Sequence, residues 1–180
     1  MLDSIFTLIV DTVAVVLASA LLLRFWMQAV RVRPPMEIAQ FTYQLTDWLV
    51  RPLRRVLPGV GGYDWASLIG AFLIALLATA FAAWLRGAFA PEAVLLLAVL
   101  QVFRWALYGL IGLIFVEVIF SWVNPRAPLA PFVRALNEPL MRPLRRIVPL
   151  MGTIDLSPLV ALLLLQIAIQ LVTSLLTSLL

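Results

Sequence analysis

The sequence predicts an all-α integral membrane protein with four transmembrane helices, built as two parallel two-helix repeats that each carry an amphipathic interfacial loop helix. Three observations predict this class. The 180 residues are 64% hydrophobic and only 12% charged, which is more apolar surface than a soluble domain of this size could cover. Four apolar segments are each long enough to cross the membrane. A block of residues also occurs twice at a fixed spacing, which indicates a duplicated unit.

The four apolar segments cover residues 5–27, 65–85, 97–122 and 158–179. Each reaches or exceeds the roughly 20 residues that cross about 30 Å of hydrocarbon. The first segment contains Asp11 where a cleaved signal peptide has an uninterrupted apolar core, so we expect an uncleaved helix.

The duplicated block begins Arg51-Pro52-Leu53-Arg54-Arg55 and recurs 91 residues later from Arg142. Residues 51–68 and 142–159 are identical at nine of eighteen aligned positions. This offset divides the chain into a first repeat, residues 1–90, and a second repeat, residues 91–180. Each repeat has two predicted spans joined by a long loop, residues 31–64 and 123–155. Two spans per repeat place both loops on the same side of the membrane.

Arginine placement predicts the orientation. All 13 basic residues are arginines, and ten of them lie in the two long loops, whereas only Arg86 lies between the second and third spans. Basic residues accumulate in cytoplasmic loops. We therefore expect a multi-pass protein of a bacterial inner membrane, with both long loops in the cytoplasm and both termini outside.

The two loops have helical patterns of their own. From Met36 onward, apolar residues recur every three or four positions with charged residues between them, and the second loop repeats the pattern. This spacing predicts amphipathic helices that lie in the membrane interface. Pro52 and Pro143 each remove a backbone donor and disfavour helix in the preceding residue, so we expect a break or kink that divides each loop into two short helices.

The duplicated block concentrates positive charge on these loops. Arginines three or four positions apart share one face of a helix, and we call the six arginines of the two blocks the basic patch: Arg51, Arg54, Arg55, Arg142, Arg145 and Arg146. One interpretation is a topology anchor, in which the arginines extend to lipid headgroups. The other is a docking surface for an acidic partner segment or a lipid phosphate.

The remaining residues of the block are candidates for turns and helix caps. They are Pro52, Pro58, Gly61, Asp64, Pro143, Pro149, Gly152, Asp155 and Ser157. Asp64 and Asp155 immediately precede spans, where a carboxylate accepts hydrogen bonds from unpaired backbone N–H groups and complements the helix dipole. A salt bridge from each aspartate to an arginine of its own block is a further possibility.

Charged residues inside the spans are costly and seldom without a role. Asp11 and Arg24 lie in the first span and are followed 93 positions later by Arg104 and Glu117. Because this offset is close to the repeat offset, we predict two interhelical ion pairs, Asp11–Arg104 and Arg24–Glu117. Alternatively, Arg24 extends to the interface and the other three line a polar cavity.

The last span carries a polar stripe at four-residue spacing, formed by Gln166, Gln170, Ser174 and Ser178. Such a stripe most often forms hydrogen bonds with neighbouring helices. A solute path and an oligomer seam are the alternatives.

The residue types narrow the function. The chain has no histidine and no cysteine, which excludes thiol chemistry, zinc fingers and histidine general bases. We expect no enzyme activity, no cofactor and no bound metal. In so apolar a chain the expected partners are the bilayer, anionic headgroups, and a membrane protein or a second copy of the chain, rather than nucleic acid.

A doubled Arg-Pro-Leu-Arg-Arg-x-x-Pro-x-x-Gly-x-x-Asp block in a four-span protein, with the second copy ending Asp-Leu-Ser-Pro-Leu-Val, resembles the bacterial YggT family. Photosynthetic relatives of that family include YlmG and a chloroplast factor for cytochrome b6 maturation. The first copy departs from the pattern after Asp64, where Trp65-Ala66-Ser67 replaces Leu156-Ser157-Pro158. The resemblance implies a small inner-membrane protein and links it to osmotic-stress tolerance, cell-division or nucleoid organisation, and cytochrome b6f assembly.

We therefore expect a non-enzymatic membrane scaffold or assembly factor that acts through the two basic loops. The alternative is a small transporter or channel component for an osmolyte or ion. Duplication and intramembrane charges occur in transporters, but no span here has the central proline break typical of them.

Overall fold

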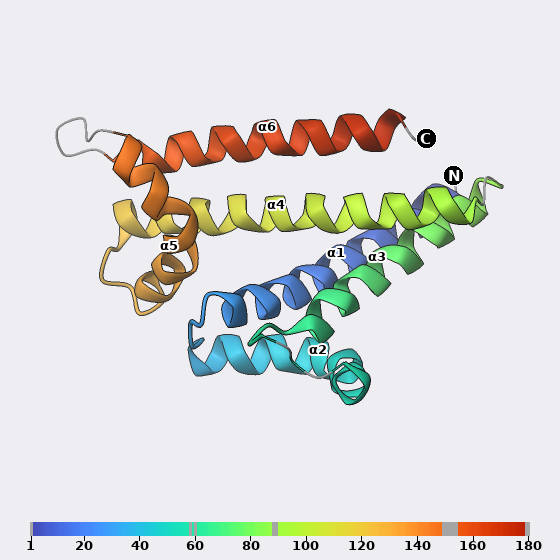
Figure 1. The fold of residues 1–180 in the computed structure, drawn as a ribbon, viewed down its shortest axis with the longest axis horizontal. Coiled ribbons are helices and arrows are strands. Elements are labelled where there is room, and N and C mark those ends of the chain that lie inside the picture. Colours follow the sequence, from blue (N-terminus) through green and yellow to red (C-terminus); the bar gives the residue numbers. More distant parts are fainter. Residues whose placement is uncertain (1, 58, 60, 88–89, 149–154, 179–180) are drawn as a thin grey trace.

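The structure is a computed structural model, and it describes residues 2–57, 59, 61–87, 90–148 and 155–178. Within these ranges the chain forms six helices and no strand (Figure 1). The helices are α1 (Leu2–Ala29), α2 (Met36–Val56), α3 (Trp65–Leu85), α4 (Pro91–Val123), α5 (Ala130–Ile147) and α6 (Ser157–Ser178). The predicted all-helical class is confirmed.

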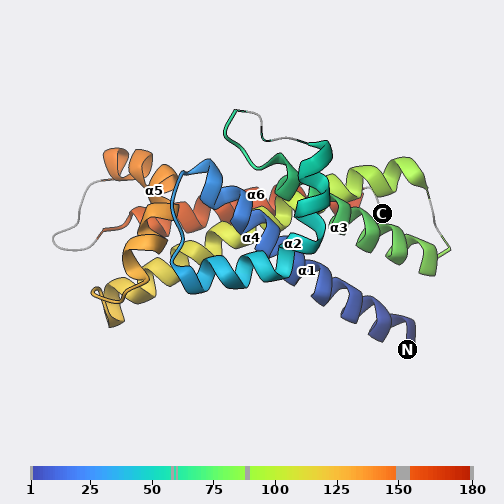
Figure 2. The ribbon, with the colours of Figure 1, turned by 90° about the horizontal axis from the view of Figure 1, so that it is seen from below.

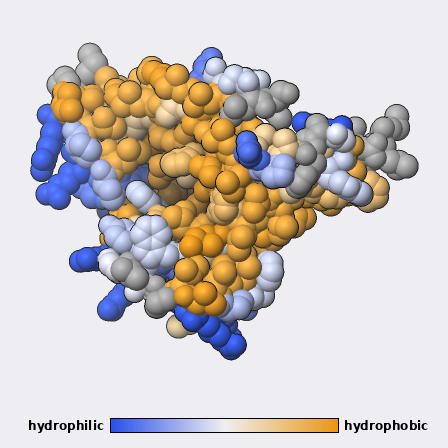
Figure 3. Space-filling model, turned by 45° about the vertical axis from the view of Figure 1, so that its right-hand side comes forward, coloured by the Kyte–Doolittle hydropathy of each residue, from blue (hydrophilic) through white to orange (hydrophobic). Residues whose placement is uncertain are grey.

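Four of the six helices, α1, α3, α4 and α6, are long and apolar enough to cross a membrane. At 1.5 Å per residue, the 21 residues of α3 extend about 32 Å, close to the thickness of the hydrocarbon core. The 33 residues of α4 exceed one crossing, so the third span is longer at both ends than the sequence predicted. Apolar side chains cover the outward surface of these helices (Figure 3), which suits contact with lipid.

The start of α1 and the end of α6 lie at one end of the bundle, together with the end of α3 and the start of α4, whereas α2 and α5 lie toward the other end (Figure 1). In the view from below, α2 lies across the C-terminal half of α1, and α5 lies beside the C-terminal end of α4 (Figure 2). Each amphipathic helix therefore packs on the spanning helix that precedes it. The helices α1 and α4 diverge toward these C-terminal ends (Figure 1).

Small residues form the core between α1 and α3. Ala14 and Ala18 of α1 lie in one buried cluster with Ala71 and Ala75 of α3, and the last two are completely buried. Small side chains let two helix backbones approach closely, which is how spanning helices pack where lipid removes the hydrophobic driving force. Ala71 and Ala75, four residues apart on α3, therefore mark its packing face toward α1.

A second buried cluster joins α4, α5 and α6. It contains Ile114 of α4, Met141 of α5, and Ala161 and Leu165 of α6. Met141 lies on the apolar face of the amphipathic pattern, so this face packs on the spanning helices rather than facing lipid alone. The second loop helix is consequently part of the folded core.

The prolines bend the amphipathic helices without dividing them. Both α2 and α5 continue through their internal prolines, Pro52 in α2, and Pro139 and Pro143 in α5, and each helix changes direction along its length (Figure 1). The expected division of each loop into two short helices is therefore wrong. A missing N–H removes only one hydrogen bond, and a kink accommodates that loss when the flanking turns are held by tertiary packing.

Candidate functional site

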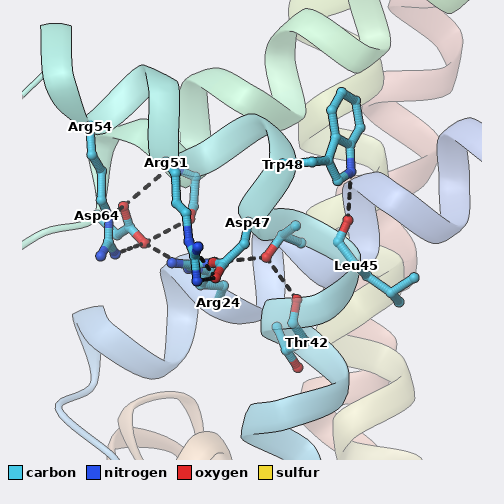
Figure 4. Close-up of polar contacts among 10 residues, drawn as sticks. Arg24, Thr42, Leu45, Asp47, Trp48, Arg51, Arg54 and Asp64 are labelled. Carbon is cyan, nitrogen blue, oxygen red and sulfur yellow. Dashed lines mark hydrogen bonds and ion pairs between the residues drawn. The ribbon is translucent and has the colours of Figure 1, made fainter.

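A buried arginine of α1 fixes α2 on the first half of the bundle. The Arg24 side chain is 7% exposed, and its Nη1 donates hydrogen bonds to Thr46 Oγ1 at 2.8 Å and Asp47 Oδ1 at 2.7 Å (Figure 4). The Arg24 guanidinium also lies 4.6 Å from the centre of the Tyr43 ring, a cation–π distance. All three contacts are with α2, so one buried cation attaches this helix to α1.

Asp64 joins three helices at the same point. Its side chain is 2% exposed and lies 2.6 Å from Arg54 Nη2 and 3.4 Å from Arg24 Nε. It also caps α3, because it accepts hydrogen bonds from the backbone N–H of Ser67 at 3.3 Å and from the Ser67 hydroxyl at 2.7 Å. Asp64 thus connects α1, α2 and the start of α3 through a single carboxylate (Figure 4).

The surroundings keep both carboxylates of this first network charged. Burial alone would raise the pKa of Asp64, but hydrogen bonds from Arg54 and Ser67 outweigh burial and hold the pKa below its ordinary value. Burial likewise opposes ionisation of Asp47, yet the hydrogen bond and charge of Arg24, with a further contribution from Arg51, lower its pKa. The first network is therefore ionised at neutral pH.

The second half of the chain has a corresponding network between α4 and α5, but the charge on the spanning helix is negative and only partly buried. Glu117 of α4 has an 11% exposed side chain and lies 3.2 Å from Arg145 Nη2 of α5. Asn137 Nδ2 donates to Glu117 Oε2 at 2.8 Å and to the carbonyl of Leu113 at 2.9 Å. This carboxylate attaches α5 to α4, as Arg24 attaches α2 to α1.

Arg145 is the centre of the second network. Its Nε lies 3.0 Å from Asp155 Oδ2, and its Nη1 lies 3.4 Å from Glu138 Oε2, in addition to the contact with Glu117. Burial would lower the pKa of Arg145, but the hydrogen bond to Asp155 and the charge of Glu117 outweigh it and raise that pKa. One guanidinium therefore holds three carboxylates from α4, α5 and the segment before α6.

The two networks share four positions at the 91-residue offset and differ at the fifth. The shared pairs are Thr46 and Asn137, Asp47 and Glu138, Arg54 and Arg145, and Asp64 and Asp155. The fifth member of each network is the spanning-helix residue, which lies at an offset of 93 rather than 91 and is a cation, Arg24, in the first network and an anion, Glu117, in the second. Sequence analysis missed Thr46 and Asn137, because neutral polar residues in a charged loop are unremarkable. Aligning the loops at the repeat offset would have placed them beside the charged positions.

The structure corrects the predicted ion pairs. Arg24 pairs with Asp47 and Asp64 rather than with Glu117, since α1 and α4 diverge at this end while α2 lies directly on α1. In the described part of the chain, Asp11 and Arg104 form no ion pair with each other or with any other residue. Arg104 Nε is buried without a hydrogen-bond partner among those residues.

The basic patch divides into engaged and free arginines. Arg51 lies 2.8 Å from Asp47, and Arg54 and Arg145 belong to the networks above. The other three, Arg55, Arg142 and Arg146, are exposed and form no ion pair or hydrogen bond with any residue that the structure describes. We call Arg55, Arg142 and Arg146 the free arginines.

Gly61, Asp64 and Asp155 have the turn and cap roles that the sequence indicated, whereas Pro52 and Pro143 lie inside helices. Gly61 has a φ of 69°, a left-handed conformation that glycine adopts without strain. Asp155 Oδ1 accepts a hydrogen bond from the backbone N–H of Ser157 at 2.8 Å, at the start of α6. Burial opposes ionisation of Asp155, but the hydrogen bonds from Ser157 and Arg145 lower its pKa. Pro58, Pro149 and Gly152 lie outside the described residues.

The polar stripe on α6 faces away from the bundle. Gln166, Gln170 and Ser174 are all exposed, whereas Leu165 and Ile169 of the same helix are buried against the bundle. The expected hydrogen bonds between this stripe and neighbouring helices are absent from the described part of the chain. The stripe lines a shallow groove of about 430 Å³.

One hydrogen bond that sequence analysis did not anticipate connects the two halves. Trp26 Nε1 of α1 donates to the carbonyl of Leu136 in α5 at 3.0 Å. Tryptophan near the end of a span is ordinarily an interfacial anchor, so the sequence gives no signal for this contact.

The fold and the two networks define a multi-pass helical membrane protein with four candidate spans and an amphipathic helix held by ion pairs in each half. The chain belongs to the CCB3/YggT family, whose family model matches residues 3–85 and 96–176. The resemblance seen in the duplicated block is thereby confirmed.

The matches to relatives cover most of this chain and most of each relative. It is 34% identical over 163 residues to "Uncharacterized protein YggT" of Escherichia coli, covering 89% of this chain and 85% of the relative. It is also 34% identical over 161 residues to "Uncharacterized protein PA0392" of Pseudomonas aeruginosa, covering 84% and 79%. An "Uncharacterized protein" of Haemophilus influenzae is 31% identical over 144 residues, covering 79% and 77%. No solved structure matches the chain.

Proposed function

We propose that this protein is a non-enzymatic scaffold or assembly factor of a bacterial inner membrane, and that it acts through the free arginines of α2 and α5. The observation that supports the proposal is the split within the basic patch. Arg51, Arg54 and Arg145 are neutralised by carboxylates of the same chain, whereas Arg55, Arg142 and Arg146 are exposed without such a partner among the described residues. The second set is available to another molecule.

The proposed orientation follows from charge. Ten arginines belong to α2, α5 and the segments that flank them, and Arg86 alone lies near the opposite end between α3 and α4. The positive-inside bias then favours a cytoplasmic position for α2 and α5. There the apolar faces of both helices contact the bundle and the interface, and the free arginines extend toward the cytoplasm or the headgroups.

The chemistry of the free arginines suits an anionic partner. A guanidinium binds a carboxylate or a phosphate through two parallel hydrogen bonds, which gives directional recognition. The networks around Arg24 and Arg145 hold α2 and α5 in fixed positions, so the free arginines present a defined pattern. We therefore propose that an acidic cytoplasmic segment of a membrane protein binds to them, while anionic headgroups help to hold the helices at the interface.

The test compares cross-linking and affinity purification from native membranes for the wild type and for the triple variant Arg55→Gln, Arg142→Gln and Arg146→Gln. The matched control is Arg86→Gln, which removes one exposed arginine near the opposite end. We expect a stable protein partner that survives in the control and is lost in the triple variant, with equal accumulation of all three proteins. A partner retained at wild-type levels by the triple variant would refute the proposal.

A transporter or channel component is the second candidate, and the spanning region supplies the observation that favours it. Arg104 has a buried Nε without a partner, and Asp11, Gln166 and Gln170 are exposed side chains within spans. Polar groups at this depth often line a solute or ion path. Purified protein in liposomes distinguishes the candidates, because saturable flux that Asp11→Asn abolishes would favour transport over the scaffold.

A further inference from the structure

The exposed face of α6 has the spacing of a helix–helix seam that the rest of the chain leaves uncovered. Its residues follow each other at intervals of four, three, four, three and four, in the order Leu159, Leu163, Gln166, Gln170, Thr173 and Thr177. Repeats of this spacing keep one side of a helix facing a partner helix along its whole length. The first four and the last are exposed, and Thr173 is half-buried.

The position of α6 leaves room for a partner. It packs on α4 and α5 through Ala161, Leu165 and Ile169, and it lies at the edge of the bundle (Figure 1). The buried side and the seam are roughly a third of a turn apart around the helix, as the 100° step between residues requires. The shallow groove of about 430 Å³ runs along the seam between Gln166 and Thr177.

The two glutamines lie where lipid is least able to accommodate them. Gln166 and Gln170 are about 14 Å and about 20 Å from the start of α6, whose 22 residues extend about 33 Å. Both side chains are exposed and have no hydrogen-bond partner among the described residues. Hydrocarbon offers no donor or acceptor to an amide, so these groups require a polar partner that the single chain does not supply.

We propose that the α6 seam is the interface of a homodimer, in which two copies pack their α6 helices in parallel. Two copies inserted in the same orientation are related by a twofold axis along the membrane normal, so each seam residue faces its own counterpart. An amide donates and accepts equally well, and therefore Gln166 and Gln170 are each complementary to the same residue of the second copy. Thr173 and Thr177 permit close approach of the two backbones.

A homodimer accounts for the composition of the seam better than lipid does. Apolar seam residues alone would be equally stable against acyl chains, whereas amides at mid-span are satisfied only by another polar surface. The dimer also brings the α5 helices of two copies to the same end of the assembly, because α5 packs directly on α6. The inference does not depend on what the free arginines bind.

The absence of cysteine from the chain allows a direct test by disulfide cross-linking. We expect Thr173→Cys to form a covalent dimer in native membranes with a membrane-permeable oxidant. Leu175→Cys is the matched control, since it is 54% exposed at nearly the same depth but on the far side of the helix from the seam. Equal cross-linking at both positions, or none at either, would overturn the proposal.

A second measurement tests the glutamines themselves. In lipid or detergent, the double variant Gln166→Leu and Gln170→Leu should dimerise at least about tenfold more weakly than the wild type, since it loses two symmetric sets of interhelical hydrogen bonds. Circular dichroism checks that the variant remains folded, and Gln170→Asn, which keeps an amide, should retain most of the association. A monomeric wild-type protein whose solute flux is lost in the double variant would overturn the proposal and assign the stripe to a solute path.

Discussion

Arg24 and Glu117 carry opposite charges, yet each attaches the amphipathic helix of its own half of the chain to the preceding spanning helix. Arg24 binds Asp47 of α2 at 2.7 Å, and Glu117 binds Arg145 of α5 at 3.2 Å. A charge buried at a membrane edge is stable only when a partner neutralises it. The two halves thus reach the same arrangement with the sign of the spanning-helix charge reversed.

Removal of the buried cation should destabilise the protein strongly. Arg24→Gln leaves Asp47 and the 2% exposed Asp64 without one of their neutralising groups. Breaking a buried ion pair by removing one partner costs about 3–5 kcal/mol. We expect a large fall in the thermal unfolding temperature in detergent and reduced accumulation in membranes.

Arg51→Gln is the matched control, because Arg51 contacts Asp47 as well but is 76% exposed. An exposed pair of this kind contributes about 0.5 kcal/mol or less. An equal loss of stability in the two variants would show that burial does not determine the contribution of these pairs.

Arg145 and Arg142 of the second block should also differ in how much each contributes to stability. Arg145 contacts three carboxylates, whereas Arg142, three positions earlier, contacts none among the described residues. Arg145→Gln should therefore lower the unfolding temperature, and Arg142→Gln should leave it unchanged while weakening partner binding. Unfolding curves and purification yields for the two variants check this directly, and loss of stability in Arg142→Gln would contradict the division into engaged and free arginines.

Stability should fall in acid. The pKa values of Asp47, Asp64 and Asp155 are lowered in the folded protein. The stability that these groups contribute is therefore fully present above the unfolded pKa of about 4 and is lost as the pH falls through the lower folded values. Thermal unfolding followed from neutral pH to about pH 2 should show a steep loss of stability below about pH 4.

Asp64→Asn tests the origin of this acid transition. It should reduce stability at neutral pH and flatten the pH dependence, because the most buried of the three carboxylates no longer ionises. Glu37→Gln removes an exposed carboxylate that contacts no arginine in the described residues, and it should keep the neutral-pH stability. An unchanged pH profile in Asp64→Asn would locate the transition elsewhere.

Local patterns predicted the fold, whereas the choice of ion-pair partners depended on tertiary packing. Hydropathy located the four spans because length and apolarity alone determine which segments enter a bilayer. The turn at Gly61 and the cap at Asp64 followed from residues adjacent in sequence. The predicted Arg24–Glu117 pair was wrong because equal depth does not bring two helices together when they diverge, as α1 and α4 do.

The continuity of α2 and α5 through their prolines likewise depends on tertiary packing, which local sequence patterns do not reveal. Proline in a loop sequence indicates a helix end when only local geometry is considered. However, Val50 and Met141, two residues before Pro52 and Pro143, are completely or almost completely buried. Tertiary packing thus holds both flanking turns in place, and α2 and α5 remain continuous. The Trp26 hydrogen bond to Leu136 has no sequence signal because its acceptor is a backbone carbonyl, which every residue has.

That hydrogen bond should control how firmly the two halves of the chain are held together. Trp26→Phe keeps an aromatic ring but removes the donor, so the hydrogen bond between the two halves is lost at a cost of about 0.5–1.5 kcal/mol. Trp48→Phe is the matched control, because Trp48 donates to Leu45 within its own helix and is 60% exposed. Spin labels on the exposed faces of α2 and α5 should give a broader distance distribution in Trp26→Phe than in the wild type, and an unchanged one in Trp48→Phe. Identical distributions in all three proteins would mean that the packing of α4 on α1 and α3 fixes the two halves without this hydrogen bond.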